Sequence, residues 1–280
     1  MPPAGPGPTA PVRPSPVTAA AGPRLLVAAA LAIAAAWTVT VTAWEPPGFW
    51  AGLLLRSVPF GLALLACAVS VWATGDPWRR PAELALPGGA RLRVPPVSGF
   101  AWLVAGQVLV MVSATSAVVR LEWLDGPDAP PAPLRYAALL PLAGMVAVAA
   151  LLIGALVAAV LAGSPRVDLT PHGIEVREPF GRRRIPWAAL APGTPARQES
   201  KNRLVLTVTR PELVERRGLP RGSRTAPRLA LPWLRVHPWF LADAIRHHVD
   251  HPDERAHIGT PAGYERLHRA VTRAVPGQPL

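Results

Sequence analysis

Four long stretches of apolar residues dominate the first part of the chain, separated by short polar segments. Each has at least the ~20 residues that a helix needs to cross the hydrocarbon core of a bilayer. Gly144, Gly154 and Ala158 in the last stretch are expected to let neighbouring helices pack closely. The pattern predicts four transmembrane helices, over residues 25–44, 49–73, 97–119 and 136–162.

In the second half, apolar residues alternate with polar ones at the period-2 spacing of half-buried strands. A four-residue spacing follows, in which Leu241, Ile245 and Val249 share one face of a helix that begins at Pro238. Residues 210–227 are rich in Pro and Arg and indicate a long mobile loop. Strands are predicted over residues 167–169, 174–178, 182–187, 204–209 and 228–233, and a helix over 238–249.

These patterns divide the chain into four parts. Residues 1–23, rich in Pro and Ala, lack the apolar content of a core and are expected to be a disordered tail. Residues 24–163 form the predicted α-helical membrane domain, and residues 164–251 a small, mostly β domain that ends in a helix. The remaining residues, 252–280, are a basic tail with a short amphipathic helix over 262–274.

Positive charge lies on one side of the predicted spans. The chain has 29 Lys and Arg against 17 Asp and Glu, a net charge of +12. The loop over 74–96 and the segment after residue 163 are basic, whereas the other two loops carry no net positive charge. The positive-inside rule therefore predicts a multi-pass cell-membrane protein with both termini in the cytoplasm. Nucleic acid is a poor candidate partner for the basic segment, because an aromatic–basic binding surface is lacking.

One stretch carries a family resemblance. The residues Val167-Asp-Leu-Thr-Pro-His-Gly-Ile-Glu-Val176, followed by Gly181-Arg-Arg-Arg-Ile-Pro-Trp187, resemble the opening strands of bacterial pleckstrin-homology-like domains in actinobacterial membrane proteins. The resemblance covers about residues 165–250. It implies a small β-barrel with a C-terminal helix.

Two groups of arginines are candidates for binding anionic lipid head groups or a protein partner. One group follows the turn of the first predicted hairpin, and a juxtamembrane arginine contributes about 1 kcal/mol toward an anionic surface. The other flanks the apolar face of the predicted tail helix, as in helices that lie on a membrane. The alternatives are solvated charges at an exposed strand and packing of the tail helix onto the β domain. The candidate residues are Arg182, Arg183, Arg184, Arg266, Arg269 and Arg273.

The sequence offers no arrangement for catalysis or cofactor binding. The one cysteine, Cys67, excludes a disulfide and a Cys-type zinc site. His247 and His251 have the i, i+4 spacing of a helical metal pair, but no third ligand follows at a fixed spacing. We therefore expect neither metal nor cofactor, and no enzymatic activity.

The function predicted from the sequence is that of a non-enzymatic membrane protein in an adaptor or regulatory role at the cell envelope. Its basic domain would bind anionic lipid head groups or a protein. The alternative is a scaffold or accessory subunit of another membrane complex. A small-molecule transporter is disfavoured, because the spans contain no acid, charge pair or interrupted helix.

Overall fold

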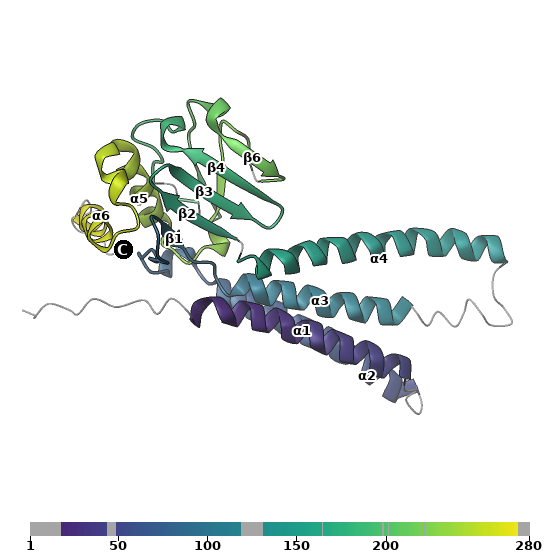
Figure 1. Cartoon of the computed structure of the whole chain (residues 1–280). Coiled ribbons are helices and arrows are strands. Elements are labelled where there is room, and N and C mark those ends of the chain that lie inside the picture. Colours follow the sequence, from purple (N-terminus) through teal and green to yellow (C-terminus); the bar gives the residue numbers. More distant parts are fainter. Residues whose placement is uncertain are drawn as a thin grey trace, which may run out of the picture.

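The computed structural model describes residues 18–43, 49–118, 131–163, 165–197, 199–200, 202–220 and 222–273. Four helices lie side by side, and a β domain covers one end of them (Figure 1). They match the four predicted stretches, except that α1 begins earlier than predicted. The helices are α1 (Thr18–Ala43), α2 (Phe49–Thr74), α3 (Gly99–Val118) and α4 (Ala132–Leu161).

The predicted disordered tail lies mainly outside the described residues. For residues 18–23 the prediction of disorder is wrong, because they belong to α1, which begins at Thr18. The residues that start this helix include three consecutive alanines, and alanine has the highest helix propensity.

Two stretches within the described residues are long and apolar enough to cross a membrane, by length and composition: Gly22–Val41 in α1 and Ser57–Thr74 in α2. Only 17% and 22% of these stretches is buried, unlike a core helix of a soluble protein. α3 and α4 contain shorter apolar stretches, Gly99–Ser113 and Val146–Leu161. Of the four predicted spans, two therefore meet this test.

Glycines bring α2 and α3 into close contact. A Cβ at Gly99 would lie 2.8 Å from the Ser70 carbonyl oxygen, and one at Gly106 would lie 3.1 Å from the Cys67 Sγ. The Ser70 hydroxyl also donates a 2.7 Å hydrogen bond to the Gly99 carbonyl. Small residues thus set the distance between these two helices.

α4 packs more loosely against its neighbours. Nothing among the described residues lies within 4 Å of a Cβ at Gly144 or Gly154, so the predicted close packing at these glycines is wrong. Large apolar side chains on α4, such as Leu140 and Leu151, are exposed. The glycines that allow close helix packing are Gly99 and Gly106 on α3.

Seven strands in the described residues form two antiparallel sheets, and five of them match predicted strands. The larger sheet has the order β1-β2-β3-β4-β6, with strands β1 (Leu92–Val94), β2 (Arg166–Thr170), β3 (Gly173–Glu178), β4 (Gly181–Pro186) and β6 (Glu215–Gly218). The smaller sheet pairs β5 (Arg203–Val205) with β7 (Arg228–Ala230).

Strand β1 comes from the chain between α2 and α3. Leu92 pairs with Leu169, and Val94 pairs with Val167, which makes β1 the edge strand of the larger sheet. Leu92 and Val94 are both buried. The β domain therefore includes part of the segment that was predicted to be a membrane loop.

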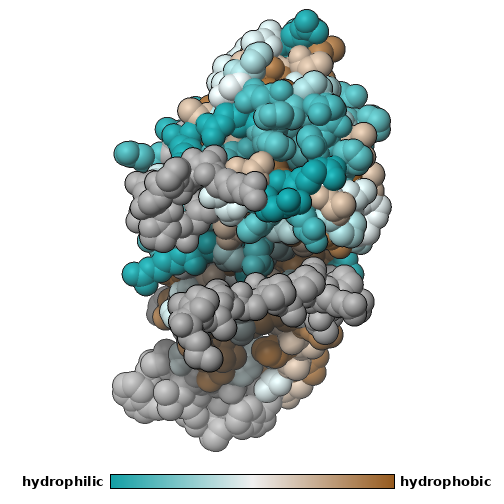
Figure 2. Space-filling view, turned by 90° about the vertical axis from the view of Figure 1, so that its left-hand side faces the viewer, coloured by the Kyte–Doolittle hydropathy of each residue, from teal (hydrophilic) through white to brown (hydrophobic). Residues whose placement is uncertain are grey.

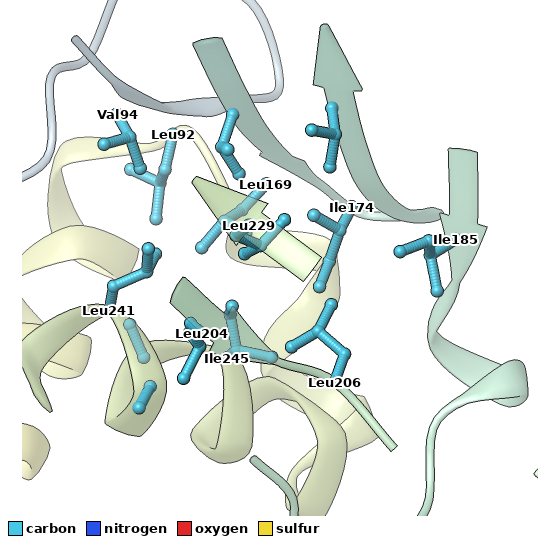
Figure 3. Close-up of a cluster of buried hydrophobic side chains, with 14 of the residues drawn as sticks. Leu92, Val94, Leu169, Ile174, Ile185, Leu204, Leu206, Leu229, Leu241 and Ile245 are labelled. Atoms are coloured by element: carbon cyan, nitrogen blue, oxygen red, sulfur yellow. The ribbon is translucent and has the colours of Figure 1, made fainter. Parts of the chain in front are cut away.

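Apolar side chains from both sheets point toward helix α5 (Pro238–Asp250) and form one core (Figure 3). Helix α6 (Pro261–Arg273) adds Leu267 and Val271 to the same core. The apolar face of the predicted tail helix thus packs onto the β domain. The core residues labelled in Figure 3 are Leu92, Val94, Leu169, Ile174, Ile185, Leu204, Leu206, Leu229, Leu241 and Ile245.

The prediction of a loop over residues 210–227 is wrong in part. This segment contains a 3-10 turn, Pro211–Leu213, and strand β6, which pairs with β4. β6 reads Glu-Arg-Arg-Gly and has no apolar alternation, because its backbone pairs with β4 while its side chains are mostly exposed. Its sequence alone therefore does not indicate a strand.

Arg80 joins the end of α2 to the β domain. Its guanidinium donates hydrogen bonds to the carbonyl oxygens of Leu231 at 2.6 Å and Pro232 at 3.1 Å. It also donates to the carbonyls of Leu234 and Thr74, the last residue of α2. One side chain thus holds a domain loop against a helix end.

A second contact involves α3. The Trp233 ring lies 5.4 Å from the Phe100 ring, between ring centroids, and the Val97 N–H donates a 2.9 Å hydrogen bond to the Trp233 carbonyl. Helices and β domain therefore meet through defined backbone and aromatic contacts.

Candidate functional site

The outer face of the larger sheet is charged, and its register aligns side chains in rows across the strands. Directly opposite residues of antiparallel strands lie on the same face, with Cβ atoms ~5 Å apart. One row mixes both signs, and ion pairs join Arg93 to Asp168 at 2.7 Å and Arg184 to Glu175 at 3.6 Å. Its members are Arg93, Asp168, Glu175, Arg184 and Glu215.

The second row contains arginine alone. In the register, Arg166 faces Arg177, Arg177 faces Arg182, and Arg182 faces Arg217. We call these four residues the arginine row. Like charges directly opposite one another destabilise a sheet in water. The arginine row therefore forms a strip of like charge that nearby negative charge would stabilise.

Members of the arginine row differ in their surroundings. Arg166 is half-buried and its Nε lies 3.3 Å from an Asp168 carboxylate oxygen. Burial lowers the pKa of Arg166, Asp168 raises it, and Arg177 lowers it further. Arg177, Arg182 and Arg217 are exposed, and within the described residues no ion pair joins them to a carboxylate.

Two apolar side chains lie beyond the arginine row, at the same end of the sheet. Phe180, in the turn between β3 and β4, is 44% exposed, and Leu219, just after β6, is 82% exposed. The Leu219 N–H donates a 2.8 Å hydrogen bond to the Phe180 carbonyl. We call this pair of residues, with the backbone that joins them, the sheet tip.

Glycine makes the close approach at the sheet tip possible. Gly218 has φ of +76°, and a Cβ there would lie 2.4 Å from the Phe180 carbonyl oxygen. A Cβ at Gly181 would lie 2.7 Å from the Pro220 nitrogen. A side chain at either position would push the two segments apart.

The predicted hairpin arginines are divided between two faces. Arg182 belongs to the arginine row, and Arg184 pairs with Glu175 in the mixed row. Arg183 points inward and is only 2% exposed. Burial lowers the pKa of Arg183, while the nearby Glu178 raises it. Arg183 therefore lies beneath the surface, and we do not include it in the site.

The predicted tail arginines lie elsewhere, on α6. Arg266 donates to Glu254 at 3.1 Å, and Arg269 is exposed. Arg273 ends α6, and its side chain is outside the described residues. α6 lies on the side of the β domain away from the four helices (Figure 1). The structure thus does not bring these arginines to the hairpin.

The arginine row lies at the end of the sheet nearest the helices. It comprises the start of β2, the end of β3, the start of β4 and the end of β6, and only residues 162–165 separate α4 from Arg166. In Figure 1, the end of β6 and the β3–β4 turn point along α4. The side of the β domain that lies on the left in Figure 1, away from this turn, is largely hydrophilic (Figure 2).

Sequence reasoning found Arg182 but missed Arg166, Arg177 and Arg217. A two-residue turn between Glu178 and Gly181 would place Arg177 opposite Arg182. That pair could have been found in the predicted hairpin. Arg217 could not, because its strand was not recognised.

Other polar clusters have structural roles. Asp243 is buried and accepts from Arg197 at 2.6 Å and from Arg246. Burial lowers the pKa of His248 to about 3, and its ring lies 5.7 Å from the Trp187 ring. In the part of the chain that the structure describes, no group of three His, Cys, Asp or Glu residues could hold a metal ion.

Comparisons with known proteins support the fold of the β domain. A family model described as a bacterial PH domain matches residues 164–199, which include β2, β3, β4 and three arginines of the row. No curated protein and no solved structure matches the chain. Over the matched segment the chain is similar to bacterial PH domains, and its antiparallel sheets with α5 agree with a small PH-like domain.

Proposed function

We propose that the protein is a non-enzymatic, multi-pass membrane protein whose PH-like domain binds anionic phospholipid head groups on the cytoplasmic face of the cell membrane. The arginine row carries this proposal, since it aligns exposed positive charge at the end of the sheet nearest the helices. PH-like domains are in general binding modules rather than catalysts, which agrees with an adaptor or regulatory role.

The pairing of β1 with β2 supports four membrane passes. These strands belong to one sheet, so they lie on the same side of any membrane that the chain spans. The chain between them must cross an even number of times, and it contains two helices, α3 and α4. With α1 and α2 as the first two passes, both termini and the β domain share one side. The excess of basic residues favours the cytoplasm for that side.

Exposed apolar surface on the helices also supports a membrane location. Lipid tails would cover these side chains, which water solvates poorly. If the protein were instead an accessory subunit, a partner helix on α4 would cover part of this apolar surface. Lipid alone is sufficient to cover all of it. The exposed residues include Leu25, Leu64, Leu65, Val71, Trp72, Leu140, Val148 and Leu151.

The electrostatic contribution of the arginine row is moderate. A basic residue near an anionic leaflet contributes about 1 kcal/mol, so the three exposed arginines together contribute about 3 kcal/mol. Bound head groups would also relieve the repulsion between neighbouring guanidinium groups. The site should therefore prefer anionic over zwitterionic lipid.

Native mass spectrometry of the full-length chain tests this preference. The protein would be mixed in detergent with equal amounts of phosphatidylglycerol and phosphatidylcholine, and bound lipids counted. We expect the wild type to bind more phosphatidylglycerol. The double variant Arg182→Gln/Arg217→Gln should lower the preference up to about thirtyfold, from about 2 kcal/mol.

A matched control removes the same charge elsewhere. Arg210 lies beyond the other end of β4, where its N–H donates to the Ala189 carbonyl, and Arg269 is on α6. Both side chains are exposed, and Arg210→Gln/Arg269→Gln should keep the preference. Equal binding of both lipids by the wild type, or equal losses in the two double variants, would refute the proposal.

A further inference from the structure

We infer that the sheet tip inserts into the bilayer, so that Phe180 and Leu219 reach the apolar boundary below the head groups that the arginine row contacts. This inference rests on the proposed function for the lipid that surrounds the tip. It adds a second, apolar element to the binding surface and fixes the depth of the domain in the membrane.

The exposure of these two side chains is built into the fold. Two glycines, Gly181 and Gly218, allow the β3–β4 turn and the end of β6 to lie against each other. The hydrogen bond from the Leu219 N–H to the Phe180 carbonyl then joins the segments. Pro220, next in the chain, is buried, so Leu219 projects outward from an anchored backbone. Transfer of the exposed apolar surface of Phe180 and Leu219 from water to an apolar environment would be favourable.

The order of residues along the strands matches the layers of a membrane interface. Phe180 comes two residues before Arg182, and Leu219 comes two residues after Arg217. Two strand residues span ~7 Å. Apolar faces of interfacial elements are buried ~5–10 Å into the boundary between head groups and acyl chains. The guanidinium groups would therefore lie among phosphates when the apolar pair reaches the acyl boundary.

The direction of the sheet tip agrees with this placement. β2 follows α4 almost directly, and the tip lies at the end of the sheet where β2 begins. In Figure 1 the β3–β4 turn points along α4 rather than away from it. The bilayer around α4 is thus the environment nearest to Phe180 and Leu219.

Fluorescence quenching in nanodiscs tests insertion. In a Cys67→Ala background, Leu219→Cys and, separately, Leu213→Cys would carry an environment-sensitive label in the full-length chain. Leu213 is a matched control, because it is 39% exposed and precedes the other end of β6. Discs would contain phosphatidylglycerol and phosphatidylcholine, with quenchers either on the lipid acyl chain near the head group or as aqueous iodide.

We expect the label at 219 to be quenched by the acyl-chain quencher and to lose iodide quenching, with the label at 213 showing the reverse. Equal iodide quenching at both positions would overturn the inference. If 219 is reached by iodide while the lipid preference measured by mass spectrometry persists, insertion fails and head-group binding stands. If the preference is absent and 219 is still quenched from the acyl chain, the apolar contact stands alone.

Discussion

Arg80 offers the sharpest test of how the β domain is fixed to the helices. Replacing it by glutamine removes a guanidinium that donates to four carbonyl oxygens, those of Thr74, Leu231, Pro232 and Leu234. Hydrogen bonds from a charged donor contribute about 1.5–3 kcal/mol each. Arg80 is half-buried, so water can replace some of them, and we take about 3 kcal/mol for the set.

Hydrogen exchange of the full-length chain in detergent measures this contribution locally. Residues 231–237, which connect β7 to α5, should exchange about a hundredfold faster in Arg80→Gln, because 1.4 kcal/mol corresponds to a factor of ten. Arg79→Gln is the control, since its side chain is exposed. Surface changes of that kind alter stability by about 0.5 kcal/mol or less. Equal exchange in the two variants would mean that Arg80 does not hold the domain.

Three further experiments test the fold. Leu92→Ala should lower the free energy of unfolding of the β domain by about 2–5 kcal/mol in a denaturant titration, because β1 belongs to its core. Gly106→Leu should disrupt packing of α2 and α3 and lower the melting temperature in detergent, whereas Gly154→Leu should not. Burial lowers the pKa of His248 from its ordinary 6.5 to about 3 in the folded chain. As the pH falls, the unfolded chain therefore protonates His248 at a higher pH than the folded chain does. Stability should fall below about pH 6.5 by at most about 1.4 kcal/mol per pH unit, and less so in His248→Leu, as melts across pH 4–8 would reveal.

Much of the fold was predictable from local patterns. The apolar runs of α1 to α4 and the alternation in β2, β3 and β4 are features of neighbouring residues. Apart from the start of α1, their predicted bounds agree with the structure to within a few residues. The same is true of α5, whose apolar residues recur at helical spacing. Local periodicity is sufficient where an element buries one face along its own length.

The strands at the two edges of the larger sheet were not predictable in this way. β1 has three residues, and its partner β2 follows two intervening helices. β6 consists of charged residues and glycine, so only its backbone pairing with β4 identifies it. The arginine row depends on this pairing, because Arg217 is distant from Arg182 in sequence. A site that forms across strands requires the register, which no single segment contains.

The origin of β1 also sets the order in which the β domain can be made. Leu92–Val94 leaves the ribosome well before Arg166–Thr170, and residues 95–165 must be synthesised in between. At about 5–20 residues per second, this delay is about 4–14 s. During that time β1 lacks its partner strand β2, and α3 and α4 are made before the two strands can pair. The larger sheet is thus complete only after the helical hairpin of α3 and α4 has been made, and until then Leu92 and Val94 lack the strand that pairs with them.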